Sequence, residues 1–387
     1  MKKQLLVIVV MTFGWAPSVM ASMSVEQRLA QMEKRLAAQD KAIQNKDGQI
    51  AALADTSKSS NSGGWWEDVE MSGAVELEAS HTSNQDIADA NNNGNSSDLN
   101  VATVELGVAA EVNDWVHANV VLLWEEEDGG NNNLTVDEAT ITIGNSDVMP
   151  MYFTGGRMTV PFGSFETQMV SDPFTVNVGE ASETVLLVGY VTNGFAGSIY
   201  AFNGDVDSGN NTIDNFGANL SYSMEVDDNA LVLSASYIND IAEADGIADN
   251  GTFTTYDNEV PGISLNANYR FGAFSVIAEY VSATDNFQSG EVAYKGQGAE
   301  PSAWHAELGY SFDGIANGAT VAVAYQETDE AVALGLPESR LSLALSIDLL
   351  ENTALSLEWA HDEAYSIANG GTGQDANTAT AKLVVEF

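Results

Sequence analysis

The chain has 387 residues, of which 44% are hydrophobic and none is cysteine, so it is long enough to fold but has no disulfide or thiolate metal site. Its charge is unevenly distributed: residues 65–387 contain five basic and 51 acidic residues. A surface this acidic repels nucleic acid and attracts cations. The composition therefore excludes a nucleic-acid-binding protein.

The first 21 residues predict a signal peptide. Lys2 and Lys3 form a basic start, residues 5–15 form an apolar run, and a small residue, Ala21, predicts cleavage after it. The apolar run is too short to span a membrane, and no later stretch of about 18 apolar residues follows. We therefore expect an exported chain that enters a membrane only as strands.

Residues 22–54 predict a periplasmic coiled-coil helix, and the polar residues 55–64 predict a flexible linker. Two interleaved sets of residues recur every seven positions: Val25, Met32, Gln39, Lys46 and Leu53, and Leu29, Leu36, Ile43 and Ile50. This heptad pattern is typical of a left-handed coiled coil, so we expect a homo-oligomer. A lone amphipathic helix is the alternative, although nothing else in the segment would bury its apolar stripe.

Residues 65–387 alternate between apolar and polar positions, which is typical of strands. In 339–349, for example, Leu341, Leu343 and Leu345 alternate with Ser342 and Ala344. A soluble β-sandwich would show the same alternation, so two further observations are needed to separate the two fold classes.

The first observation is that short and long connections alternate between the predicted strands. We predict sixteen strands: 69–80, 99–112, 115–125, 134–143, 150–160, 184–192, 195–203, 213–226, 230–239, 260–271, 273–283, 302–312, 319–328, 339–350, 353–363 and 377–387. Tight turns at one end and long polar loops at the other are the layout of an outer-membrane barrel. The strands 150–160 and 184–192 have the weakest patterns, so fourteen strands is the alternative.

The second observation is the terminal strand 377–387, whose apolar face ends in Phe387. A terminal aromatic residue on that face resembles the recognition signal of outer-membrane proteins. Because every backbone polar group in a bilayer needs a partner, strands must close into a barrel. The sequence thus predicts an all-β protein of the cell outer membrane, a transmembrane antiparallel up-and-down β-barrel of about sixteen strands.

If the apolar faces meet lipid, the opposite faces line the lumen. This predicts mostly acidic side chains inside the barrel: Glu76, Glu78, Glu105, Glu111, Glu225, Arg270, Glu279, Glu307, Arg340, Glu358 and Lys382. Each of them singly can be part of a solvated wall without a ligand. Together, an excess of carboxylates favours cations.

The connection 161–183 differs from the other long loops because it is rich in apolar residues. An external loop need not be so apolar, so we expect this segment to fold inward and narrow the pore. The residues predicted at the constriction are Arg157, Phe162, Phe165, Glu166, Asp172 and Glu180.

The same region carries a resemblance to a known family. Residues 156–167 (GRMTVPFGSFET), with 171–174 (SDPF) and Gly179-Glu180, resemble the LbtU family of siderophore porins. The N-terminal heptads, Trp65-Trp66 and Phe387 are similar too. Phosphate-selective porins share a Gly-basic-x-x-x-Pro-Phe-Gly element, but they line their pores with many bases. The resemblance implies uptake of ferric siderophores across the outer membrane.

Two other functions fit the residues: a general cation-preferring diffusion porin, or a barrel that mainly anchors the envelope through its coiled coil. Enzyme activity is not expected, because His81-Thr82-Ser83 only weakly resembles the His-x-Ser of outer-membrane phospholipases. The calcium-loop start at Asp89 lacks the glutamate required at its twelfth position, which is Asn100. We expect no catalytic residue, metal site or cofactor; the expected partners are outer-membrane lipid and a small solute.

Overall fold

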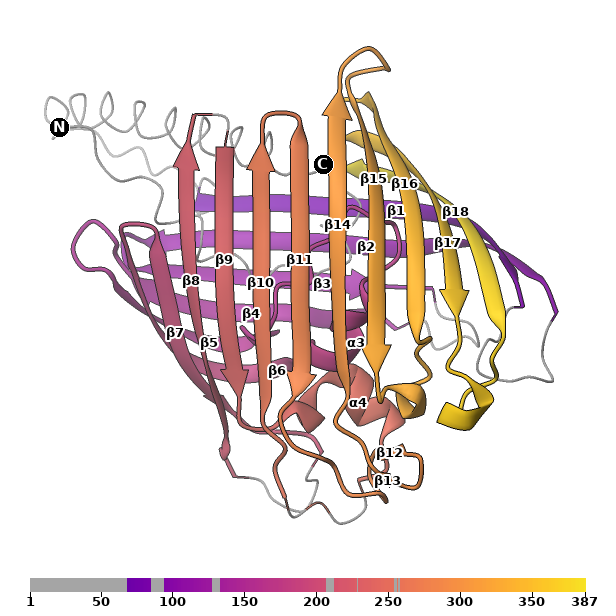
Figure 1. The fold of residues 1–387 in the computed structure, drawn as a ribbon. Helices are drawn as coiled ribbons and strands as arrows, with labels where there is room; N and C mark the ends of the chain where they lie inside the picture. The colour runs from indigo at the N-terminus through magenta and orange to yellow at the C-terminus, as the bar shows by residue number, and fades with distance from the viewer. Residues whose placement is uncertain are drawn as a thin grey trace, which may run out of the picture.

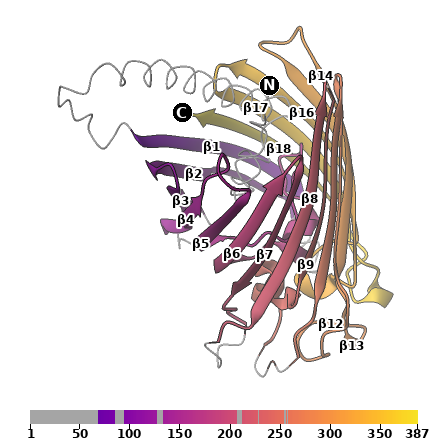
Figure 2. The ribbon, with the colours of Figure 1, turned by 90° about the vertical axis from the view of Figure 1, so that its left-hand side faces the viewer.

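Sixteen strands close into a single antiparallel barrel (Figures 1 and 2). The computed structural model describes residues 68–84, 94–126, 133–206, 212–227, 229–253, 256 and 258–387. The predicted signal peptide, coiled coil 22–54 and linker 55–64 lie outside the described residues. Each barrel strand pairs with its neighbours in the chain, and β1 closes the barrel by pairing with β18.

The predicted strands are all present. The barrel strands are β1 (Val69–Ser83), β2 (Ser96–Asn113), β3 (Val116–Trp124), β4 (Thr135–Gly144), β5 (Met151–Thr159), β6 (Ser182–Thr192), β7 (Phe195–Phe202), β8 (Asn215–Val226), β9 (Asn229–Ile238), β10 (Gly262–Phe271), β11 (Phe274–Ala283), β14 (Ser302–Phe312), β15 (Ala319–Asp329), β16 (Ser339–Leu350), β17 (Thr353–Glu363) and β18 (Asp375–Glu386). The prediction of sixteen strands is confirmed, including the two weakest patterns, which form β5 and β6.

Small elements lie in the long connections. They are α3 (Phe174–Gly179), η3 (Ile241–Glu243), α4 (Asp245–Asn250), the paired strands β12 (Ala293–Tyr294) and β13 (Gln297–Gly298), η4 (Val332–Leu334) and η5 (Ile367–Asn369). Figure 1 shows α3, α4, β12 and β13 at the lower end of the barrel, while the short turns and the C-terminus lie at the upper end. No helix among the described residues is long and apolar enough to cross a membrane.

The two faces of each strand differ in exposure, as the alternation predicts. On β14, Trp304, Leu308 and Tyr310 are exposed, whereas His305 and Glu307 are buried. Large apolar side chains therefore point out of the barrel and polar ones point into it. An outer row of rings lies near the short turns of β10, β11 and β14, with centroids 4.9–6.1 Å apart: Tyr269, Phe271, Phe274, Tyr310 and Phe312. Such a row is typical of an interfacial girdle.

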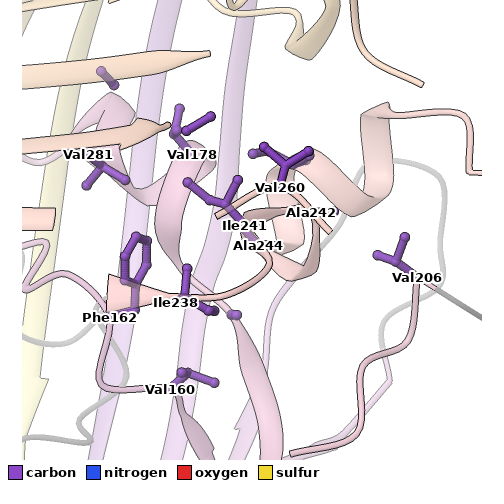
Figure 3. Packing of buried hydrophobic residues seen from close by; sticks show 14 of the residues in the cluster. Val160, Phe162, Val178, Val206, Ile238, Ile241, Ala242, Ala244, Val260 and Val281 are labelled. Atoms are coloured by element: carbon purple, nitrogen blue, oxygen red, sulfur yellow. The ribbon is translucent and has the colours of Figure 1, made fainter. Parts of the chain in front are cut away.

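The main hydrophobic cluster lies at the end of the barrel that carries the long loops. It joins the loops 160–181, 239–261, 284–301 and 330–338 to the ends of β5, β6, β7, β9, β11 and β14. Figure 3 shows Phe162, Val178 and Ile241 within this cluster, and all three are fully buried. We call these packed loops the loop cap. Because the cap has its own core, it fixes the loop between β5 and β6 relative to the wall.

Candidate functional site: a segment against the inner wall

The chain turns inward directly after β5. Phe162 N donates to Val160 O at 2.6 Å, and Gly163 has a φ of +88°. A Cβ atom at Gly163 would lie 2.3 Å from the ring of Phe165, so a larger residue would displace that ring. The Pro161-Phe162-Gly163 sequence therefore makes a tight turn that only glycine permits at its third position.

Residues 163–175, which we call the anchored segment, follow this turn and contact the polar inner face of the barrel. On β11, the carboxylate of Glu279 accepts hydrogen bonds from Ser164 N at 2.6 Å and Phe165 N at 3.0 Å. The same carboxylate accepts a bond from Thr175 Oγ1 at 2.9 Å. Donors at both ends of the anchored segment thus bind the same wall residue, Glu279.

Two more glutamates and one glutamine hold the rest of the segment. Glu307 on β14 accepts bonds from Gln168 N at 2.7 Å and from Thr167 Oγ1. Glu358 on β17 accepts bonds from Ser171 N at 2.8 Å, Ser171 Oγ at 2.7 Å and Val170 N. Gln326 on β15 accepts one from Phe174 N at 2.8 Å. We call Glu279, Glu307 and Glu358 the anchoring glutamates.

Apolar side chains of the segment pack against the wall between these bonds. Met169 packs against inward-facing alanines of β15 and β16, Ala322, Ala324 and Ala344. Phe165 and Phe174 are buried in the main cluster. Because alanines leave space on the inner wall, the segment lies close to it.

The predicted constriction residues have different environments. Phe162 and Phe165 are buried, and Glu166 accepts a hydrogen bond from Asn268 Nδ2 on β10. Asp172 is exposed to the lumen. Partial loss of hydration inside the enclosed barrel raises the pKa of Asp172, opposed by the positive charges of Lys382 and Arg340.

Glu180 lies half-buried just after α3, where its carbonyl oxygen accepts a 2.7 Å bond from Asp245 N of α4. Burial, together with the repulsion of neighbouring acids such as Asp172 and Asp245, raises the pKa of Glu180 to about 8. Glu180 therefore belongs to the loop cap and not to the anchored segment.

Arg157 lies away from the other predicted constriction residues. Its partners across the strands are Ala139 of β4 and Thr184 of β6, and both Thr184 and Arg157 are exposed. The next pair, Met158 and Glu183, is buried. The register thus pairs Arg157 with side chains on the outward-facing side of the strands.

The other predicted lumen residues fall on inward-facing positions. Lys382 Nζ lies 3.2 Å from Glu76 Oε2, and Arg340 makes two hydrogen bonds with Asp362, of 2.6 and 3.0 Å. Glu105 is buried, whereas the side chains of Glu78 and Arg270 are half-buried and those of Glu111 and Glu225 are exposed toward the ends of β2 and β8. The anchoring glutamates face inward too, but the segment covers them.

Sequence reasoning did not single out Gln326, Asp362 or Asn268. Gln326 and Asp362 share the inward register of β15 and β17 with Ala324 and Glu358, so the alternation was the available signal. No group of three or more His, Asp or Glu side chains in the described part of the chain can hold a metal ion.

The family model described as Gram-negative porin matches residues 50–384. The chain belongs to the Gram-negative porin family. Among curated proteins, this porin is 30% identical over 358 residues to the UPF0422 protein of Legionella pneumophila strain Lens, covering 82% of the chain and 66% of that protein. It is 26% identical to the UPF0422 protein of Coxiella burnetii, and the match covers 75% of this chain and 64% of that protein. The chain therefore spans 64–66% of the length of these relatives.

Solved structures show the same fold at low identity. An anion-selective porin from Comamonas acidovorans aligns with a TM-score of 0.58 and 13% identity over 82% of this chain and 99% of that one. The outer-membrane channel DcaP of Acinetobacter baumannii aligns with a TM-score of 0.56 and 13% identity over 82% and 97%. OprB of Pseudomonas putida aligns with a TM-score of 0.57 and 12% identity over 83% and 94%. The porin thus shares the barrel fold of these outer-membrane proteins.

Proposed function

We propose that this porin passes small solutes across the outer membrane with a preference for cations. The main observation behind the proposal is that most of the bases in the lumen are held in ion pairs, whereas several of the acids are not. Two of the three inward-facing bases, Arg340 and Lys382, form ion pairs with Asp362 and Glu76. In the described part of the chain, no ion pair joins Glu78, Glu105 or Asp172 to a base.

An excess of carboxylates makes the potential in the lumen negative, and a low-dielectric wall concentrates that field. Cations are then enriched in the pore and anions are depleted. Because Asp172 lies on the lumen side of the anchored segment, its charge acts where the segment narrows the pore.

Reversal potentials across a planar bilayer in a KCl gradient test the proposal. The expected sign is that of a channel more permeable to K⁺ than to Cl⁻, and the preference decreases as salt rises because screening shortens the range of the field. A reversal potential of zero or of the opposite sign would contradict it.

A second candidate function is the passage of ferric siderophores. It is supported by the resemblance of residues 156–180 to the LbtU family, because most of this stretch forms the turn and the anchored segment. Proteoliposome uptake of a cationic ferric hydroxamate and of an anionic ferric carboxylate siderophore would test it. We expect faster uptake of the cationic complex; no uptake above protein-free liposomes for either complex would exclude this function.

We also propose that the porin forms homo-oligomers through the heptads of residues 22–54. The support comes from the sequence, since the heptad stripe needs a partner helix to be buried.

A further inference from the structure

We propose that Glu279, Glu307 and Glu358 are positioning residues that hold the anchored segment as a fixed partition in the lumen. Each of the three is inward-facing and at most 6% exposed. Each carboxylate accepts hydrogen bonds from at least two donors of the segment, and each set of donors includes a backbone N–H. Their role is thus to fix the segment and not to attract solutes.

The donors follow the chain in the same order as their acceptors follow the wall. Backbone N–H groups bound to the wall recur every three residues, at 164–165, 168 and 170–171. The acceptors lie on β11, β14 and β17, and β17 is four strands from β11. Four strand spacings cover about 19 Å. Six extended residues also cover about 20 Å. The six residue spacings from 165 to 171 are therefore long enough to cross from β11 to β17, and they meet β14 after one strand spacing and β17 after three more.

The donors explain why these positions are glutamates. A carboxylate offers two acceptor oxygens, and in Glu279 and Glu307 each oxygen binds a different donor. A glutamine would offer one acceptor oxygen and turn an NH2 group toward a backbone N–H. A Glu→Gln change therefore leaves one donor of the segment unpaired although the side chain has the same size.

Two further contacts lie between the anchoring glutamates. His305 is almost fully buried, and its Nε2 lies 3.2 Å from the carbonyl oxygen of Glu166. Ser275 Oγ donates a 2.9 Å bond to Gln168 Oε1. The segment thus contacts the wall at nearly every residue from 164 to 171, so we infer a static constriction and not a mobile gate.

This inference rests on the porin fold but not on the solute or on the cation preference. It can be tested without measuring transport, because the chain contains no cysteine and a spin label can be placed at a single engineered one. Asp172→Cys is suitable because Asp172 is exposed and makes no hydrogen bond to the wall among the described residues.

Label mobility is compared in D172C alone and with E307Q, E358Q or E105Q added. Glu105 is the matched control: it faces inward, is buried and loses the same charge, but among the described residues no hydrogen bond or ion pair joins it to the anchored segment. Loss of one hydrogen bond should increase the detached population roughly tenfold, so E307Q and E358Q should raise the label mobility. E105Q should leave the label mobility at the level of D172C.

Equal mobility in all four proteins would overturn the proposal, and so would a rise in E105Q as large as that in E307Q. Ser171→Ala provides a second route if the wall variants fail to fold. It removes one donor to Glu358 from the segment side and changes no charge. A mobile label in that variant supports anchoring, and an unchanged label contradicts it.

Discussion

Arg340 and Asp362 face each other across β16 and β17, and the guanidinium donates two hydrogen bonds of 2.6 and 3.0 Å to the carboxylate. The guanidinium carbon also lies 4.8 Å from the centre of the Phe174 ring. One inward-facing base is therefore held by the wall on one side and by the anchored segment on the other, which neutralises it and fixes its position.

Replacing Arg340 by Ala should destabilise the barrel by about 2 kcal/mol, because Asp362 loses its partner in a partly buried site. It should also increase the cation preference, since one positive charge leaves the lumen. Unfolding in urea, followed by tryptophan fluorescence, measures the first effect. The double variant R340A/D362A should regain part of the lost stability; a double variant as unstable as the sum of the two singles would show that the pair is not coupled.

Asp172→Asn should lower the K⁺/Cl⁻ permeability ratio without changing the fold, because the exposed carboxylate loses its charge in the lumen. Reversal potentials in a salt gradient measure the ratio. Asp147→Asn is the control, since Asp147 is an exposed acid in the short turn between β4 and β5. If the two variants shift the potential equally, Asp172 does not set the selectivity.

Leu220→Arg should destabilise the barrel by about 2–4 kcal/mol, because an arginine on the lipid face near mid-strand loses its hydration. Leu220 lies in the middle of β8 and is 59% exposed. Ser221 is the next residue and lies on the inner face, so Ser221→Arg should lower the free energy of unfolding by less than about 1 kcal/mol. Equal shifts of the urea midpoint would mean that the assigned facing of β8 is wrong.

The loop cap should be more stable in acid than in base. Burial raises the pKa of Glu180 to about 8 and that of Glu243 to about 7, from an ordinary value of 4.5. A carboxyl with a raised pKa in the folded form favours the protonated state, so docking of the cap weakens as the pH rises from about 4.5 to about 8.

Hydrogen exchange of residues 239–261, corrected for the intrinsic pH dependence of exchange, measures this weakening. Glu180→Gln should flatten the change between pH 6 and 8, whereas Glu300→Gln, an exposed acid of another loop, should not. Exchange that is independent of pH in the wild-type protein would rule the prediction out.

Deleting residues 24–54 should leave a folded barrel but weaken its oligomers, because the heptads lie outside the strand pattern and precede a linker. Heat-modifiable migration on gels checks the fold, and chemical cross-linking checks the oligomer. The same cross-linked species before and after deletion would assign the oligomer to another part of the chain.

Most of the fold is determined by the sequence itself. In a barrel each strand meets lipid on one side and the lumen on the other, so the period of two in residues such as Leu341, Ser342 and Leu343 specifies both the strand and its facing. Alternating short and long connections then specify the order and direction of the strands. Arg157 shows the limit of this signal: Gly155 and Gly156 precede it and have no side chain to mark a face, so the alternation by itself does not assign Arg157 to either side of the wall.

The surroundings of the inward-facing glutamates were decided only by the tertiary structure. Glu105 and Glu307 have the same chemistry and the same facing, yet only Glu307 binds the anchored segment, which lies 139 residues earlier in the chain at Gln168. Strand alternation is a local property and carries no information about which distant segment fills the lumen. That choice depends on the tight turn at Gly163, the alanines that admit Met169 and the backbone N–H groups of the anchored segment that bind the wall glutamates, which act together only in the closed barrel.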